Sequence, residues 1–221
     1  MNNMDSLLSF DTELLLFING HHCPFMDQVM WYISTKWLWI PLYIALAGLL
    51  CWRFGWKKTL LYLAAFGIAV GLSDYISSGV LKTLFARFRP TREPALQGLV
   101  HMVNDYCGGK YGFPSSHASN TMSVALLFCL IWSQPSGREV KKSHLAWWLL
   151  MIWSLVVCYS RMYLGVHYPL DITCGLILGA LVAAAVFLFL RSVEAAYRRR
   201  DADRDRTSGA DDDGKVRSAC P

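Results

Sequence analysis

Residues 160–171 place Arg161, His167 and Asp171 in a short stretch between two apolar segments. Ionisable groups at membrane depth cost at least ~2.5 kcal/mol each unless they face protein or water, so three together indicate a site that needs them. Pro169 is typical of a first helical turn, which puts His167 just before a helix and Asp171 about one turn further on. Asp171 could accept the proton of one ring nitrogen and leave the other as a nucleophilic lone pair. The alternative is an ordinary loop histidine after an arginine that ends a helix.

A second stretch carries two cations at helical spacing. Lys82 and Arg89 are seven residues apart, which is two helical turns, so we expect both on one face of a helix that ends at Pro90. Two cations on one face suit an anion. Taken singly, either residue could instead extend from the end of a span to the membrane interface.

A third stretch, Ser115-Ser116-His117, precedes another apolar segment. Serine is a good N-cap, and the free N–H groups of a helix start bind anions. A capping pair alone carries no functional information. A histidine beside the pair, with a second histidine at position 167, favours a phosphate cradle.

These groups would together form a metal-free site for phosphoryl transfer. Such transfer depends mostly on positioning and on stabilising charge on the phosphoryl oxygens, and the groups expected to do this are Lys82, Arg89, Ser115, Ser116 and Arg161. His167 would attack phosphorus in line and form a phosphohistidine, while His117 would protonate the leaving oxygen and then activate water. We expect no metal and no cofactor, because the seven cysteines show no C-x-x-C pairing.

The composition is that of a polytopic membrane protein, with 54% hydrophobic residues in 221. Apolar segments predict about five spans, at residues 37–52, 60–81, 121–132, 146–159 and 172–190. Residues 1–28 interleave leucines with acids and predict an amphipathic interfacial helix. We therefore expect an all-α transmembrane helical bundle at residues 29–190. Residues 191–221 are expected to be a charged tail, disordered after a short helical extension.

The basic residues predict the orientation. With five spans the basic clusters share one side, namely Arg53, Lys57 and Lys58, then Arg138, Lys141 and Lys142, then residues 191–200. By the positive-inside tendency that side is the cytoplasm, so the C-terminus is cytoplasmic and the three polar stretches face the periplasm from the inner membrane. Charges that flank spans indicate no nucleic-acid partner.

Two further features leave alternatives open. Asp74, within the second expected span, is either functional or the partner of a nearby cation. Cys23 and Cys107 would share the oxidising side, where they either pair or stay free.

The motifs Lys82-x6-Arg89-Pro90, Pro114-Ser-Ser-His117 and Ser160-Arg161-x5-His167-x3-Asp171 resemble the three signature motifs of the type 2 phosphatidic acid phosphatase family. The likeness covers about residues 30–190. The family usually has glycine in place of Ser116, and we expect tighter space rather than lost activity. The resemblance implies a helical bundle with its site at the outer membrane–water interface, the residue roles given above, and a lipid phosphate as the partner in the membrane.

Within that family the chain resembles phosphatases of lipid A, acting on the 4'- or 1-phosphate, and undecaprenyl diphosphate phosphatases. The segment 11–39 and the loop 106–112 look most like the former. Residues 91–113 include Asn104, Asp105 and Tyr106, which suit a sugar, although a solvated lid is the alternative. A phosphotransferase that passes phosphate to a second lipid, and a non-enzymatic membrane protein, are further alternatives. The sequence does not give the oligomeric state.

Overall fold

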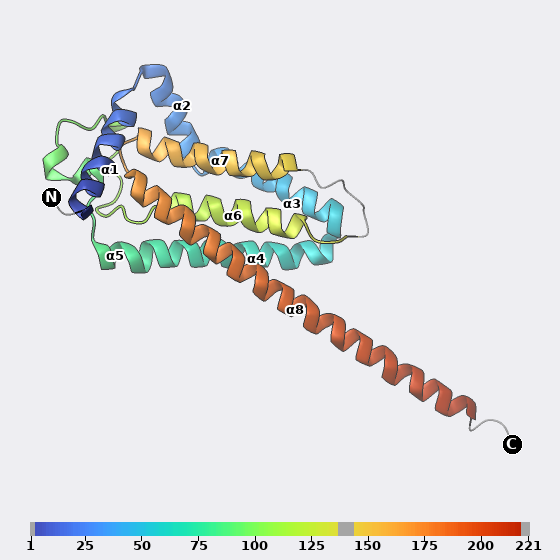
Figure 1. Cartoon of the computed structure of the whole chain (residues 1–221). Helices are drawn as coiled ribbons and strands as arrows, with labels where there is room; N and C mark the ends of the chain where they lie inside the picture. The colour runs from blue at the N-terminus through green and yellow to red at the C-terminus, as the bar shows by residue number, and fades with distance from the viewer. Residues whose placement is uncertain (1–2, 137–143, 218–221) are drawn as a thin grey trace.

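The computed structural model describes residues 3–136 and 144–217, with side chains as far as residue 200 except Arg198. Within these ranges the protein is all-α and has no strand. Figure 1 shows the helices in chain order: α1 (Asn3–Gly20), α2 (Pro24–Ser34), α3 (Ile40–Phe54), α4 (Trp56–Asp74), α5 (Lys82–Phe85), α6 (Ser116–Trp132), α7 (His144–Tyr163) and α8 (Pro169–Arg217).

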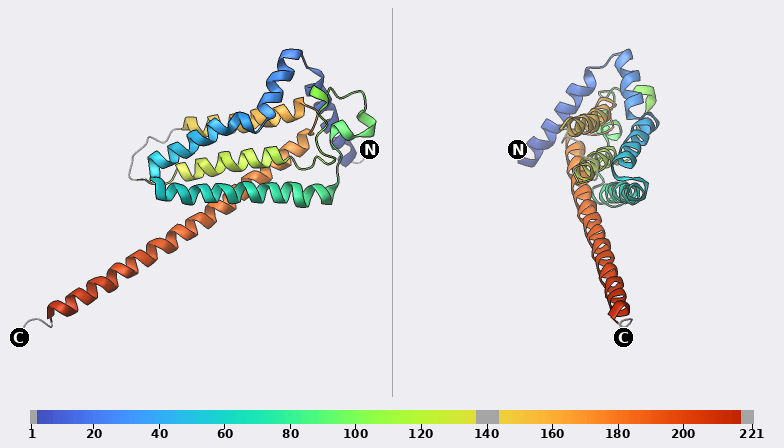
Figure 2. Two further views of the ribbon diagram at one scale, coloured as in Figure 1. Left: turned by 180° about the vertical axis from the view of Figure 1, so that it is seen from behind. Right: turned by 90° about the vertical axis from the view of Figure 1, so that its right-hand side faces the viewer.

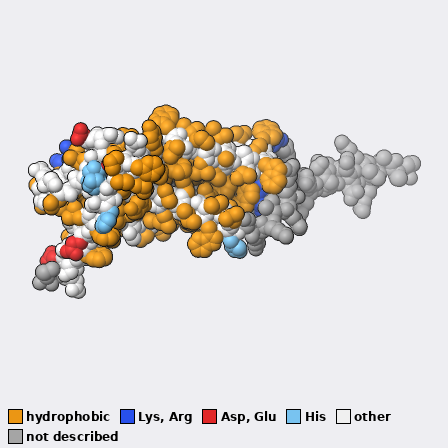
Figure 3. All heavy atoms as spheres, turned by 90° about the horizontal axis from the view of Figure 1, so that it is seen from above, with side chains coloured by type: hydrophobic (Ala, Val, Ile, Leu, Met, Phe, Trp, Pro, Cys, Tyr) orange, Lys and Arg blue, Asp and Glu red, His pale blue; other side chains and the backbone are white. Residues whose placement is uncertain are grey.

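In the described part of the chain, four helical stretches are long and apolar enough to cross a membrane: Trp37–Phe54, Trp56–Phe85, His144–Tyr163 and Pro169–Tyr197. Helix α6 holds the remaining expected apolar segment, the third in chain order (residues 121–132), in 17 residues, or roughly 25 Å at 1.5 Å per residue. Figure 3 shows that apolar side chains cover most of the middle of the molecule on the face seen from above. The expected transmembrane helical bundle is confirmed.

Helix α6 forms the centre of the bundle and packs against α4, α7 and α8 (Figure 1). Its contact with α8 is close because Gly175 and Gly179 face it. A Cβ at these positions would lie 2.5 Å from the Ser115 carbonyl oxygen and 2.2 Å from the Ser119 carbonyl oxygen. Small residues four apart allow this backbone approach between membrane helices. As a result the start of α6 lies beside the start of α8, and the Ser115 N–H donates to the Asp171 carbonyl over 2.9 Å.

Helix α1 lies across the end of the bundle where the polar stretches gather (Figures 1 and 2). It contacts α7 and α8 and buries Asp11, Leu15 and Asn19. The helix expected in residues 1–28 is thus two helices, α1 and the start of α2. At the other end, α8 continues to Arg217 as one helix, well beyond residue 190 (Figure 2). The end of the expected tail, residues 218–221, lies outside the described part.

The expectation of one helix face from Lys82 to Arg89 was wrong. Helix α4 passes into a π-helical segment, Tyr75–Leu81, and α5 ends at Phe85. Ala86 then takes a left-handed conformation (φ 47°), and the chain becomes extended, with Phe88 bridged to Tyr111. A continuous helix would have placed Arg89 on the same face as Lys82, two turns further on. The left-handed Ala86 instead turns the chain out of the helix. Arg89 therefore reaches the site from a loop.

Candidate active site

One cavity of about 790 Å³ brings the three polar stretches together. The predicted site residues that line it are Lys82, Arg89, Ser116, His117, Arg161 and His167. The polar part of the cavity lies at the end of the bundle that α1 crosses. Side chains that are far apart in sequence, and that the loop charges placed on one side of the membrane, are thus neighbours in space.

His167 and Asp171 form the expected pair. Their contact joins His167 Nδ1 to Asp171 Oδ2 over 3.4 Å, and both side chains are buried. The Tyr168 N–H donates to the same carboxylate oxygen over 3.0 Å, so the first turn of α8 fixes the acid beside the ring. The other ring nitrogen, Nε2, lies 3.4 Å from Arg89 Nη1. The pKa of His167 is lowered well below its ordinary value by burial and further by the charges of Arg89 and Arg161. The ring is therefore neutral at neutral pH, as a nucleophile requires.

Arg89 is held by backbone oxygens rather than by an acid. Its Nε donates to the Tyr111 carbonyl over 3.1 Å and its Nη1 to the Val166 carbonyl over 3.4 Å. Gly112 permits this arrangement, because a Cβ there would stand 2.9 Å from Asp171 Oδ2 and 3.3 Å from the Arg89 side chain. Burial, and then the charge of Arg161, lowers the pKa of Arg89, but a guanidinium keeps its charge at any working pH.

Lys82 and Ser116 meet through the π-helical segment. Lys82 Nζ donates to Ser116 Oγ over 2.7 Å and to Ser78 Oγ over 3.3 Å, and the two serine oxygens are 2.6 Å apart. Ser78 belongs to the π-helical segment, whose extra residue resets the register of the helix just before Lys82. Such insertions recur at functional sites. The Ser116 hydroxyl, which stands where the family that the motifs resemble usually has glycine, thus contacts the lysine.

Arg161 is the third cation of the cavity. It is 3% exposed and donates to the Ser34 hydroxyl of α2 and, over 3.4 Å, to the Tyr106 hydroxyl of the loop. Its Nε has no hydrogen-bond partner among the described residues. A buried guanidinium with a free N–H is suited to an oxyanion.

In the described ranges, neither Lys82, Arg89 nor Arg161 forms a salt bridge. Buried charges are normally paired, because taking a lone charge out of water is costly. Three cations gathered around one cavity without carboxylate partners therefore indicate a site for an anionic ligand.

Arg87 was not predicted as a site residue, yet it holds Asp171 in place. Its Nη1 donates to Asp171 Oδ1 over 2.9 Å and its Nη2 to Asp11 Oδ2 over 2.6 Å. The guanidinium also lies 3.9 Å above the ring of Tyr168. Asp11, on α1, accepts the N–H of Leu170 over 2.8 Å, so the first helix is joined to the base of the site. The sequence feature that could have revealed this network is Asp11, an acid on the apolar face of α1, one turn before Leu15.

Several residues expected at the site lie elsewhere. Ser115 caps α6, with its hydroxyl accepting from the Ala118 N–H, and it does not line the cavity. Its backbone N–H is bound to Asp171, so it is not free for a ligand. Of the loop residues expected to read a sugar, only Tyr106 lines the cavity, while Asn104 and Asp105 are exposed.

Two open questions from the sequence receive an answer. Asp74 lines the cavity and accepts from Asn120 Nδ2 over 3.5 Å, without a salt bridge to any described cation. Cys23 and Cys107 are both free thiols.

The cavity continues from its cationic end into an apolar channel between α3, α4 and α6. Its walls there are Tyr43, Leu46, Leu50, Leu63, Phe66, Val70 and Val124. Such a channel suits hydrocarbon, and the cationic end suits an anion. The ligand that fits both is amphipathic, with an acidic headgroup.

Comparison with known proteins agrees with this reading. Residues 58–194 match the model of the PAP2 superfamily. A lipid A 4'-phosphatase of Bacteroides thetaiotaomicron is 36% identical over 80% of this chain and 75% of its own length, and one of Porphyromonas gingivalis is 36% identical over 86% and 78%. The undecaprenyl-diphosphatase BcrC of Bacillus subtilis is 30% identical over 81% of this chain and 82% of its own length. The crystal structure of a transmembrane PAP2-type phosphatidylglycerolphosphate phosphatase from Bacillus subtilis has the same fold, with a TM-score of 0.60 at 23% identity, covering 88% of each chain.

Proposed function

The chain belongs to the PAP2 superfamily and is a bacterial membrane phosphatase acting on lipid phosphates, and on that basis we propose that it removes the 4'-phosphate of lipid A through a phosphohistidine at His167. The single observation that carries the mechanism is a neutral histidine surrounded by three cations that form no salt bridge with any described residue. The cations would bind the phosphoryl oxygens, and the histidine would attack the phosphorus between them.

In the first step the lone pair of His167 Nε2 attacks phosphorus. The P–N bond forms as the P–O bond to the lipid breaks, and His117 gives a proton to the departing oxygen. Asp171 accepts a hydrogen bond from the Nδ1–H of His167. This bond keeps the lone pair on Nε2 and stabilises the ring when it becomes positively charged. Lys82, Arg89 and Arg161 stabilise the charge spread over the transferred oxygens.

In the second step His117 takes a proton from water, and the water oxygen attacks phosphorus. The P–N bond breaks, phosphate leaves, and both histidines return to their starting state. Ser116 contributes its N–H at the start of α6, which points an N–H donor at the anion. No residue of this scheme requires a metal.

Lipid A is favoured over undecaprenyl diphosphate for two reasons. Both relatives named as lipid A 4'-phosphatases are 36% identical to the chain, whereas the undecaprenyl-diphosphatase is 30% identical. Tyr106 of the loop also lines the cavity, and its hydroxyl and ring face suit a sugar. Undecaprenyl diphosphate is the alternative substrate, and the 1-phosphate of lipid A is the alternative position.

The site would face the periplasm from the inner membrane, with the end of α8 in the cytoplasm. The support is the charge bias of the loops: Lys57 and Lys58 lie at the start of α4, at the end of the bundle away from α1. Substrates of the outer leaflet would then reach the site directly.

Phosphate release by the purified protein from a panel of lipids tests this proposal. The panel holds lipid A, its 1-dephosphorylated and 4'-dephosphorylated forms, and undecaprenyl diphosphate. We expect the largest kcat/KM on lipid species that carry the 4'-phosphate. Faster turnover of the prenyl diphosphate would contradict the substrate and favour the alternative.

A loop variant separates headgroup recognition from chemistry. Asn104→Gly with Asp105→Gly removes two side chains without backbone strain, because both positions have positive φ. Tyr106 is kept, since it contacts Arg161 and its loss would affect every substrate. If the loop reads the sugar, activity falls more on lipid A than on undecaprenyl diphosphate. Equal losses on both would identify the loop as a lid.

A further inference from the structure

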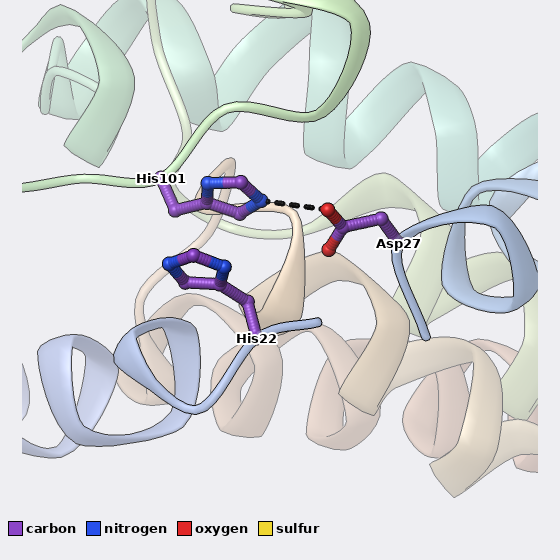
Figure 4. A group of neighbouring side chains, drawn as sticks. All are labelled: His22, Asp27 and His101. Atoms are coloured by element: carbon purple, nitrogen blue, oxygen red, sulfur yellow. Dashed lines mark hydrogen bonds and ion pairs between the residues drawn. The ribbon is translucent and has the colours of Figure 1, made fainter. Parts of the chain in front are cut away.

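His22, Asp27 and His101 form a cluster outside the catalytic cavity (Figure 4). His22 lies in the turn between α1 and α2, Asp27 in the first turn of α2, and His101 in the loop that follows α5. None of the three lines the cavity. Each offers an atom that binds metals, and these atoms all lie within 4.8 Å of one another.

The two imidazoles are spaced like ligands of one ion. Their rings are stacked, with centroids 3.6 Å apart and planes 3° from parallel, and each turns a nitrogen toward the side where Asp27 lies (Figure 4). Two nitrogens on a tetrahedral zinc, at bonds of about 2.1 Å, are roughly 3.4 Å apart. Because the rings are nearly parallel, their in-plane lone pairs run alongside each other, and a shared ion requires the His22 ring to rotate out of the stack. His22 is exposed and can make that rotation.

The other two ligands are held by neighbouring residues. The buried side chain of Asn19 accepts a hydrogen bond from the backbone N–H of His101 over 2.8 Å and donates one to the His101 backbone carbonyl over 2.9 Å. The Tyr163 hydroxyl donates to Asp27 Oδ1 over 2.6 Å and leaves Oδ2 for His101, 3.0 Å away. Such outer contacts orient metal ligands and raise affinity.

The cluster offers one carboxylate and two imidazoles, which is a common set for Zn²⁺.

We propose that His22, Asp27 and His101 bind one Zn²⁺ ion, with its fourth position taken by water. The ion joins the turn between the first two helices to the loop over the catalytic cavity. Its role is to fasten that loop, and the hydrolytic chemistry does not pass through it.

The test uses the full-length protein in detergent, purified without a histidine tag and stripped with a chelator. Calorimetric titration with ZnCl2 should give one ion per chain, and His22→Ala should weaken binding by at least about tenfold. The matched control is His21→Ala, which removes a neighbouring exposed histidine that is bonded to the Phe17 carbonyl and lies outside the cluster. The affinity of His21→Ala for zinc should equal that of the unaltered protein.

Thermal unfolding provides a second readout. Because zinc binds the folded state, it should raise the melting temperature of the unaltered protein and of His21→Ala but not of His22→Ala. Without zinc, His22→Ala should melt with the unaltered protein, since its side chain is exposed, and this shows that the variant is folded. Absence of zinc binding by the unaltered protein, or equal binding by His22→Ala, would overturn the proposal.

Discussion

The two nitrogens of His167 face opposite arrangements of charge. On the Nε2 side, Lys82, Arg89 and Arg161 line a cavity and have no salt bridge in the part of the chain that the structure describes. On the Nδ1 side, Arg87 lies between two carboxylates, those of Asp11 and Asp171, over 2.6 and 2.9 Å. The same residue type thus appears unpaired on one side of the ring and doubly paired on the other.

This difference distinguishes side chains that would bind a ligand from side chains that support the structure. Unpaired like charges repel and are costly to bury, so the cationic side is destabilising until an anion arrives. Paired charges with good geometry hold their neighbours in place, and losing one partner leaves the other uncompensated. The side chains around the cavity should therefore matter for activity, and those behind the ring for stability as well.

Removing a cavity cation should give the largest effect. Arg89→Gln should lower kcat/KM by about 10²- to 10³-fold, which is typical for one donor to a transition-state oxyanion. Its melting temperature should not fall, because one of three repelling charges is gone. The control is Arg92→Gln, an exposed arginine outside the cavity. A strong loss of stability in Arg89→Gln would show that this arginine supports the fold rather than a ligand.

Removing the supporting arginine should instead destabilise the protein. Arg87→Gln leaves two buried carboxylates without their cation, and we expect a loss of roughly 3 kcal/mol in the free energy of unfolding. Chemical denaturation in detergent measures it. Adding Asp11→Asn to Arg87→Gln should recover part of the loss, because one of the two unpaired charges disappears. No recovery would show that the two residues do not act as one network.

The fold was predictable where composition and periodicity decide it. The five apolar segments each became part of a helix, because a long apolar run in a membrane has few other ways to satisfy its backbone. The meeting of the three motifs followed from loop charges that placed them at one end. The route to Arg89 was not predictable, since a left-handed Ala86 is rare and the sequence gives no sign of it.

Within the site, the sequence predicted residues that motifs mark and missed those that only packing reveals. Lys82, Ser116 and His167 were assigned from type and spacing. Arg87 and Asp11 were missed because they are 76 residues apart and meet only when α1 folds over the end of the bundle. Ser115 was assigned to the phosphate, but the close α6–α8 contact turns its N–H to Asp171.

The cationic side should also affect the pH dependence of catalysis. The pKa of His167 is lowered by burial first and then by Arg89 and Arg161, so the free enzyme keeps a neutral nucleophile below pH 6.5. Removing the charge in Arg89→Gln raises this pKa toward its ordinary value. The acidic limb of the plot of log kcat/KM against pH should therefore lie at higher pH for Arg89→Gln than for Arg92→Gln. Ionisation of the substrate affects both variants equally. Coincident limbs would mean that His167 does not respond to the cationic side.

The smallest effect is expected at Ser116. Ser116→Gly restores the residue that is usual in the family and removes one hydrogen bond from Lys82, which keeps its bond to Ser78. A single such bond contributes about 1 kcal/mol net, so kcat/KM should change by no more than about fivefold. A loss as large as that of Arg89→Gln would make the Ser116 hydroxyl part of the catalytic machinery.

Transfer of phosphate through His167 can be tested by rapid quenching in alkali during turnover. Phosphohistidine survives alkali, so mass spectrometry of the digested protein can locate the phosphoryl group. We expect it on the peptide that holds His167, within the first turnover, and on no peptide of His167→Ala, which should also release no phosphate. Phosphate release by His167→Ala, or a phosphoryl group on a different residue, would contradict the account.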